Sequence, residues 1–128
     1  MMRLTFAAAC ALGFLALPQS ASAQGNVRFP EQMRGYWRLN VDRCTRPAQG
    51  FEADAMLVTA REMRGPEVDR KPLSIRQASR EPLSWDARVT ESVGGTRNLR
   101  FVISERGGAM RLIVIYGRDN SEIFTLCQ

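Results

Sequence analysis

The stretch that decides the fold is Leu99–Tyr116, LRFVISERGGAMRLIVIY. On either side of Gly107-Gly108 every second residue is apolar, which is the period of a β-strand with one buried face. A glycine pair between two such runs is typical of a hairpin turn. We therefore predict an antiparallel hairpin with strands near 99–104 and 110–116. Its inward positions are Leu99, Phe101, Ile103, Met110, Leu112, Val114 and Tyr116.

The same period recurs on both sides of this hairpin. Residues 73–76, 85–90 and 122–127 alternate in the same way, and Gly94-Gly95 and 117–120 supply further turn signals. Short turns between successive strands indicate an antiparallel meander. In the first of these runs, Leu73 and Ile75 are predicted to share the inward face.

The segment before the meander is less regular. Residues 29–35 read as one helical turn, with Pro30 at its first position and Gly35 at its end. Residues 36–40 then alternate like a strand, and 42–53 carry the polar, Pro and Gly residues of a loop. Residues 54–63 fit either a strand or a helical face, and we interpret them as a strand.

These segments predict an all-β protein with about seven strands, preceded by a short helical turn. A single antiparallel meander of this length closes into a barrel or folds over into a barrel-like sandwich.

The beginning of the sequence predicts export. Arg3 precedes an apolar run, Leu4–Leu17, and a small-residue end at Ala21-Ser22-Ala23. This pattern is typical of a secretory signal peptide over residues 1–23, cut after Ala23. A lipoprotein site at Cys10 fits poorly because the apolar run continues beyond it. We expect a periplasmic or secreted protein with one domain, 24–128, and no transmembrane segment.

Cleavage after Ala23 leaves Cys44 and Cys127 as the two cysteines of the mature chain. Two thiols in an oxidising compartment most simply form one disulfide. The bridge would close a loop of about 80 residues, for which the chain-entropy estimate is about 4–5 kcal/mol. It would also hold the first and last strands together, which favours closure of the barrel.

Gly35-Tyr36-Trp37, after a one-turn helix and at the start of a meander, resembles the opening of the lipocalin and calycin barrels. The resemblance implies that Gly35 allows a tight entry into the first strand. It also implies that Trp37 closes the barrel floor. It extends to the general strand pattern and implies an architecture more than a ligand.

Catalysis is not expected from this composition. The chain has no histidine, which removes the commonest general base and metal ligand. If both mature cysteines are oxidised, a thiol nucleophile and a thiolate metal site are also excluded. We find no nucleophile motif, and we expect no cofactor and no metal.

Two residue sets are candidates for binding. Interior aromatic residues either line a pocket for a small apolar ligand or fill the barrel, and we favour filling. Outward arginines form a candidate face for an anionic partner, although we favour an ordinary charged exterior as their explanation. The two sets are Trp85, Phe101, Tyr116 and Phe124, and Arg76, Arg88, Arg100 and Arg111.

The expected function is therefore that of a non-catalytic, exported β-barrel with a binding or structural role. One alternative is a lipocalin-like carrier of a small apolar ligand. Another is an inhibitor of a secreted or envelope hydrolase, working through a loop at 64–72 or the hairpin tips. No nucleic-acid partner is expected, because no aromatic residues interleave with the arginines.

Overall fold

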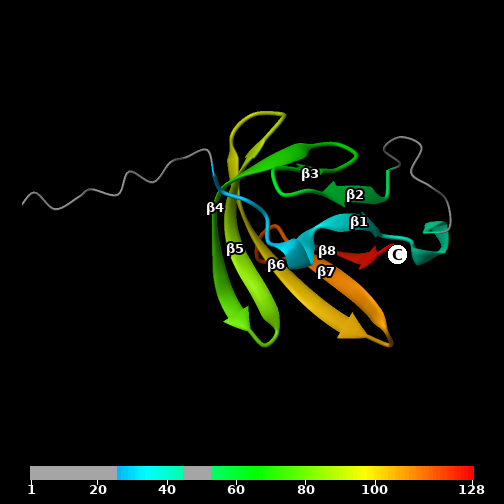
Figure 1. Ribbon diagram of the computed structural model, residues 1–128. Coiled ribbons are helices and arrows are strands. Elements are labelled where there is room, and N and C mark those ends of the chain that lie inside the picture. The colour runs from blue at the N-terminus through cyan, green and yellow to red at the C-terminus, as the bar shows by residue number, and fades with distance from the viewer. Residues whose placement is uncertain (1–25, 45–52) are drawn as a thin grey trace, which may run out of the picture.

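The computed structural model describes residues 26–44 and 53–128, and it shows a closed antiparallel β-barrel (Figure 1). Each strand pairs with the next along the chain, and β8 pairs with β1. The all-β prediction is confirmed. The predicted signal peptide and most of the predicted loop 42–53 lie outside the described residues. The elements are η1 (Glu31–Met33), β1 (Gly35–Arg38), η2 (Val41–Arg43), β2 (Ala55–Val58), β3 (Met63–Arg64), β4 (Asp69–Arg80), β5 (Leu83–Glu91), β6 (Thr96–Arg106), β7 (Ala109–Ile115) and β8 (Ser121–Leu126).

The barrel has eight strands because the predicted strand at 54–63 is two strands. Thr59 makes the turn between them: its backbone N–H donates to the carbonyl of Glu62 at 2.9 Å, and its hydroxyl accepts from the N–H of Glu62 at 3.1 Å. Such a hydroxyl-stabilised turn reverses the chain without glycine or proline. Met56 and Val58 on β2 and Met63 on β3 are all buried, so the apolar pattern runs straight through the turn.

The helical turn is confirmed as η1, a 3-10 turn, but Pro30 is its N-cap and lies just before it. Gly35 starts β1 with a φ of +142°, a conformation that side chains other than glycine rarely adopt. A Cβ at this position would lie 2.7 Å from Cδ1 of Leu126. The tight entry that the calycin resemblance implied is therefore present in the backbone.

The barrel interior is occupied by side chains at its centre and at the end that holds η1. Phe29 and Met33 enter from the N-terminal segment and have no exposed surface, like Trp37 on β1. The indole Nε1 of Trp37 donates to the Met33 carbonyl at 2.9 Å, and Phe29 packs edge-on against Phe101 with 6.1 Å between ring centroids. The η1 turn therefore acts as a plug, and the filled interior that we favoured describes this part of the barrel.

One strand departs from simple alternation. The pairing of β4 with β5 shifts between Pro72 and Ser74, and again between Gln77 and Ser79. A β-bulge of this kind places two residues opposite one and reverses which side chains point inward. Pro72 is therefore buried, whereas Leu73 is 41 % exposed. The prediction that Leu73 shares the inward face with Ile75 is wrong for Leu73.

The ring closes between β1 and β8, where the register has two residue pairs, Trp37 with Leu126 and Arg38 with Thr125. The predicted disulfide between Cys44 and Cys127 is present beside this seam, with a Cα–Cα distance of 5.1 Å. Within the described residues, no helix has the length and apolar character needed to cross a membrane.

Candidate functional site

The end of the barrel opposite η1, which we call the mouth, is lined by polar side chains. It is formed by the turns that follow β3, β5 and β7. The inward side chains of the strands around the mouth are apolar in the barrel and ionisable at the mouth itself. On β5 the inward residue after Val89 is Glu91, and on β8 the inward residue before Phe124 is Glu122. We call this set the mouth ring. Its members are Arg70, Glu91, Arg97, Tyr116 and Glu122.

Glu91 is the centre of the mouth ring. Its side chain is only 8 % exposed and pairs with Arg97, with 2.7 Å between Oε1 and Nε. The same oxygen lies 3.4 Å from Nε of Arg70, whose side chain is 10 % exposed. A carboxylate withdrawn from water is costly unless it is paired. The two guanidinium groups supply that pairing and hold the three side chains in one arrangement.

Tyr116 links this ion-pair network to β8. The guanidinium carbon of Arg70 lies 5.3 Å from the centre of its ring, a cation–π geometry. Its hydroxyl donates to Oε2 of Glu122 at 2.5 Å. Burial, and after it this hydrogen bond, raises the pKa of Tyr116 far above its ordinary value. The phenol therefore remains a hydrogen-bond donor at any physiological pH.

A pocket of about 250 Å³ opens inside the mouth ring. Its floor includes Met56 and Phe124, which are 2 % and 4 % exposed and belong to the core. Loop 65–68, between β3 and β4, forms part of the rim, together with Asn120 from the turn after β7. The loop predicted at 64–72 is shorter than expected, because β4 begins at Asp69. The remaining lining residues are Leu39, Ala53, Arg70, Arg97, Tyr116 and Glu122.

The predicted interior aromatics divide between core and pocket. Phe101 is fully buried against Phe29, away from the mouth. Trp85 is 5 % exposed and lies near the N-terminal segment, with Pro30 and Ile75 around a shallow surface hollow. Phe124 and Tyr116 do line the mouth pocket. The proposed barrel-floor residue Trp37 lies fully buried at the η1 end, as described above.

The sequence reasoning missed the four charged members of the mouth ring. Arg70, Glu91, Arg97 and Glu122 belong to no motif that singles them out in the sequence. A usable signal was present for three of them, because extending the alternation by one step beyond Val89, Leu99 and Phe124 places Glu91, Arg97 and Glu122 inward. The same extension gives no signal for Arg70, which lies inward because of the bulge in β4. Closure of the barrel brings the ends of five strands to one opening. The sequence of a single strand does not show that these residues meet.

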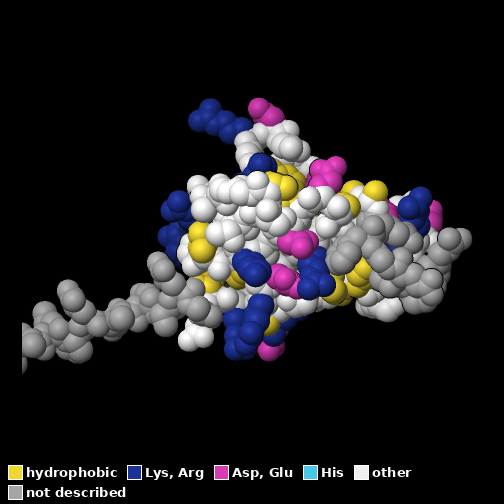
Figure 2. Space-filling view, turned by 90° about the horizontal axis from the view of Figure 1, so that it is seen from above, with side chains coloured by type: hydrophobic (Ala, Val, Ile, Leu, Met, Phe, Trp, Pro, Cys, Tyr) yellow, Lys and Arg dark blue, Asp and Glu magenta, His cyan; other side chains and the backbone are white. Residues whose placement is uncertain are grey.

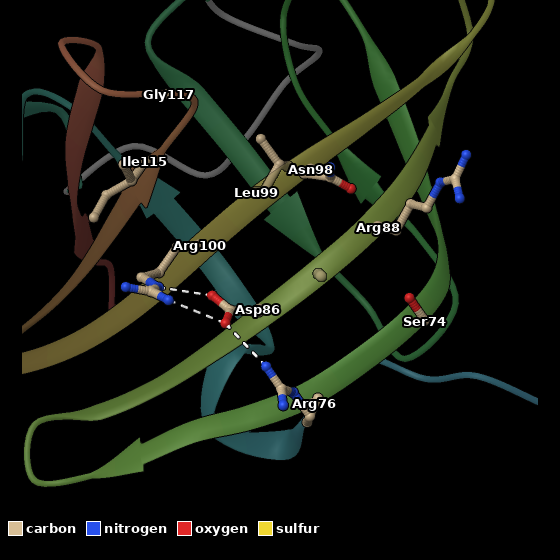
Figure 3. Close-up of a pocket in the computed structure, with 10 residues that line it drawn as sticks. Ser74, Arg76, Asp86, Arg88, Asn98, Leu99, Arg100, Ile115 and Gly117 are labelled. Carbon is tan, nitrogen blue, oxygen red and sulfur yellow. Dashed lines mark hydrogen bonds and ion pairs between the residues drawn. The ribbon is translucent and has the colours of Figure 1, made fainter.

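The arginine face is only partly assembled. Arg76, Asp86 and Arg100 lie in one register row across β4, β5 and β6 (Figure 3). Arg100 binds Asp86 through two hydrogen bonds of 2.7 and 3.0 Å, and Nη2 of Arg76 lies 3.7 Å from the same carboxylate. The hydrogen bond from Arg100, chiefly, lowers the pKa of Asp86.

The other two arginines differ in position. Arg88 lies one row along, paired with Asn98 of β6. Together with the Arg76–Asp86–Arg100 row it lines an open groove on the outer wall. Arg111 pairs with Ser104, four positions along β6 from Arg100, and does not line this groove. Three of the four predicted arginines therefore line one groove and Arg111 does not, because register determines which outward residues are neighbours.

The exterior as a whole is mixed in charge. Figure 2 shows basic and acidic side chains interspersed on the face seen from above. Among residues 26–44 and 53–128 no group of three or more His, Cys, Asp or Glu side chains is placed to hold a metal ion. Comparison of the chain with family models, with curated proteins and with solved structures found no match. The closed eight-stranded barrel is consistent with a calycin-like architecture.

Proposed function

We propose that this protein is an exported, non-catalytic binding protein that takes a small amphiphilic molecule at the mouth of its barrel. The observation that carries the proposal is the mouth pocket, in which an apolar floor meets a wall of mutually paired polar groups. Small-molecule sites are typically concave, mostly apolar and equipped with a few well-placed polar groups. Export is supported by the disulfide, which is typical of oxidising compartments.

The size of the pocket limits the ligand. Drug-sized ligands occupy pockets of about 300–1,000 Å³, and the mouth pocket holds about 250 Å³. The centre of the barrel offers no deep extension there, because Trp37, Phe101 and Leu112 fill it without exposed surface. The ligand is therefore a small molecule whose apolar end rests on Met56 and Phe124 near the surface.

The charges of the pocket favour a ligand without net charge. The lining holds two arginines, Arg70 and Arg97, and two carboxylates, Glu67 and Glu122. Glu91 already engages both arginines, and Tyr116 already engages Glu122. A ligand with a charged head would compete with one of these existing pairs in a half-enclosed site. A neutral head preserves them.

The non-catalytic part of the proposal rests on composition. The sequence holds no histidine, and Cys44 and Cys127 are joined to each other. In the mouth ring Glu91 is engaged by Arg70 and Arg97, and Glu122 is engaged by Tyr116. A group that acts as a base needs a free acceptor pointed at a substrate proton.

Prodan, a neutral naphthalene dye that emits at shorter wavelength in apolar surroundings, tests the proposal. We expect its emission to shift to the blue with the wild-type protein. The variant Asn120→Trp should reduce this shift, because Asn120 lines the rim and an indole there fills the opening. Asp119→Trp is the control, since Asp119 belongs to the same exposed turn but does not line the pocket. Absence of a shift with the wild type, or equal shifts for the two variants, would refute the site.

A further inference from the structure

We propose that the open groove on the outer wall of β4, β5 and β6 is a second binding site, for an acidic polysaccharide. The groove lies on the outside of the barrel and shares no lining residue with the mouth pocket, so the inference is independent of the function proposed above. Its charged lining is Arg76, Arg88, Arg100 and Asp86, an excess of two positive charges.

The guanidinium groups are positioned and still accessible. Asp86 receives two of the five N–H donors of Arg100 and lies beside Arg76. The side chains of Arg76 and Arg100 remain 83 % and 54 % exposed. The two hydrogen bonds hold Arg100 in place, and the donors of both arginines that the carboxylate does not use face solvent. Figure 3 shows Asp86 between the two arginines, with Arg88 and Ser74 farther along their strands.

The neutral lining suits sugar hydroxyl groups. Ser74 and Asn98 flank Arg88 in the adjacent row and offer a hydroxyl and an amide. Asp86 adds carboxylate oxygens that accept from hydroxyl groups. Ala87 and Leu99 are buried core residues, so they contribute backbone to the floor. Gly117 leaves the wall open, since nothing lies within 4 Å of the position its Cβ would take.

Other polyanions fit less well. The described residues that line the groove include no Phe, Tyr or Trp, whereas single-stranded nucleic acids require aromatic side chains for base stacking. A protein partner would require an apolar, aromatic-rich centre, and Ile115 is the outward apolar side chain that the groove offers. An acidic polysaccharide carries carboxylates separated by sugar rings with hydroxyl groups. The groove offers arginines for the carboxylates, with Ser74 and Asn98 beside them for the hydroxyl groups.

The test uses polygalacturonate, in which each sugar carries a carboxylate, with neutral dextran as the reference polymer. We expect the mature protein to bind polygalacturonate and not dextran at 0.15 M salt. The double variant Arg88→Gln/Arg100→Gln should bind about tenfold more weakly and with a shallower salt dependence, because two counterion-releasing contacts are lost. Asp86 keeps Arg76 as its partner in this variant, and a thermal melt verifies that the barrel is intact.

The matched control is Arg106→Gln/Arg111→Gln. It removes the same net charge from residues outside the groove, so it should leave the affinity within about twofold of wild type if position rather than total charge matters. Equal weakening by both double variants would overturn the proposal. So would absence of binding by the wild type, or tighter binding of poly-L-glutamate than of polygalacturonate, which would indicate an acidic polypeptide.

Discussion

At the scale of single residues, the most informative side chain is Tyr116. It was predicted as one of several interior aromatics, and it lies where the core meets the mouth ring. Its ring contacts Arg70 on one side, and its hydroxyl donates to Glu122 on the other. The apolar periodicity identified it as inward but gave no indication of its partners, because these come from strands distant in sequence.

The phenol of Tyr116 should titrate abnormally late. Burial, then the hydrogen bond to Glu122, raises its pKa in the folded protein above the ordinary value of 10.0. The resulting contribution to stability is fully present below about pH 10 and is lost as the pH rises through the elevated pKa. Absorbance of phenolate at alkaline pH should show one phenol resisting ionisation until unfolding.

Tyr116→Phe should abolish that resistant step while leaving the barrel folded at neutral pH. Because Tyr36 is present in both proteins, the difference between the two titrations reports Tyr116. An identical alkaline titration of wild type and variant would show that Tyr116 is not held as described.

At the scale of elements, alternation predicted the strands well and their exact faces less well. The hairpin of β6 and β7 matches the prediction because Gly107 and Gly108 permit a tight turn with positive φ. Two features escaped prediction. The turn at Thr59 depends on a hydrogen bond to the threonine hydroxyl. Because threonine is also common in strands, the sequence gives no sign of this turn. The bulge at Leu73 depends on how β4 registers against β5, which the sequence of β4 alone does not encode.

The bulge can be tested by a pair of identical truncations. Leu73→Ala should cost less than about 1 kcal/mol, as expected for a partly exposed side chain. Leu99→Ala, on the inward face of β6 and 3 % exposed, should cost about 2–5 kcal/mol through lost burial and a cavity. Urea denaturation of both variants measures the difference. A cost at Leu73 as large as that at Leu99 would mean that β4 follows plain alternation.

At the scale of the whole molecule, the barrel closes through few residue pairs, as it does on either side of β3. The long hairpins β4–β5 and β6–β7 project together beyond η1 (Figure 1). By contrast, β1 and β8 share two residue pairs. The cysteines permitted closure to be predicted from sequence, since they connect the first and last strands. The polar mouth could not be predicted in the same way, because it exists only after the ring has formed.

Removal of the disulfide should therefore have a large effect. The bridge joins residues 83 positions apart, and the double variant Cys44→Ser/Cys127→Ser should lose about 4–5 kcal/mol of unfolding free energy. Denaturant titration with and without reductant measures the loss. Reductant should lower the midpoint of the wild type and leave that of the double variant unchanged. A wild-type midpoint that does not respond to reduction would show that the seam is held by pairing alone.

The plug formed by Phe29 and Met33 limits how a ligand could reach the barrel interior. Because these side chains close one end of the ring, the ligand proposed above would enter and leave through the mouth. An amphiphile would enter with its apolar end first, and its polar head would stay at the protein surface.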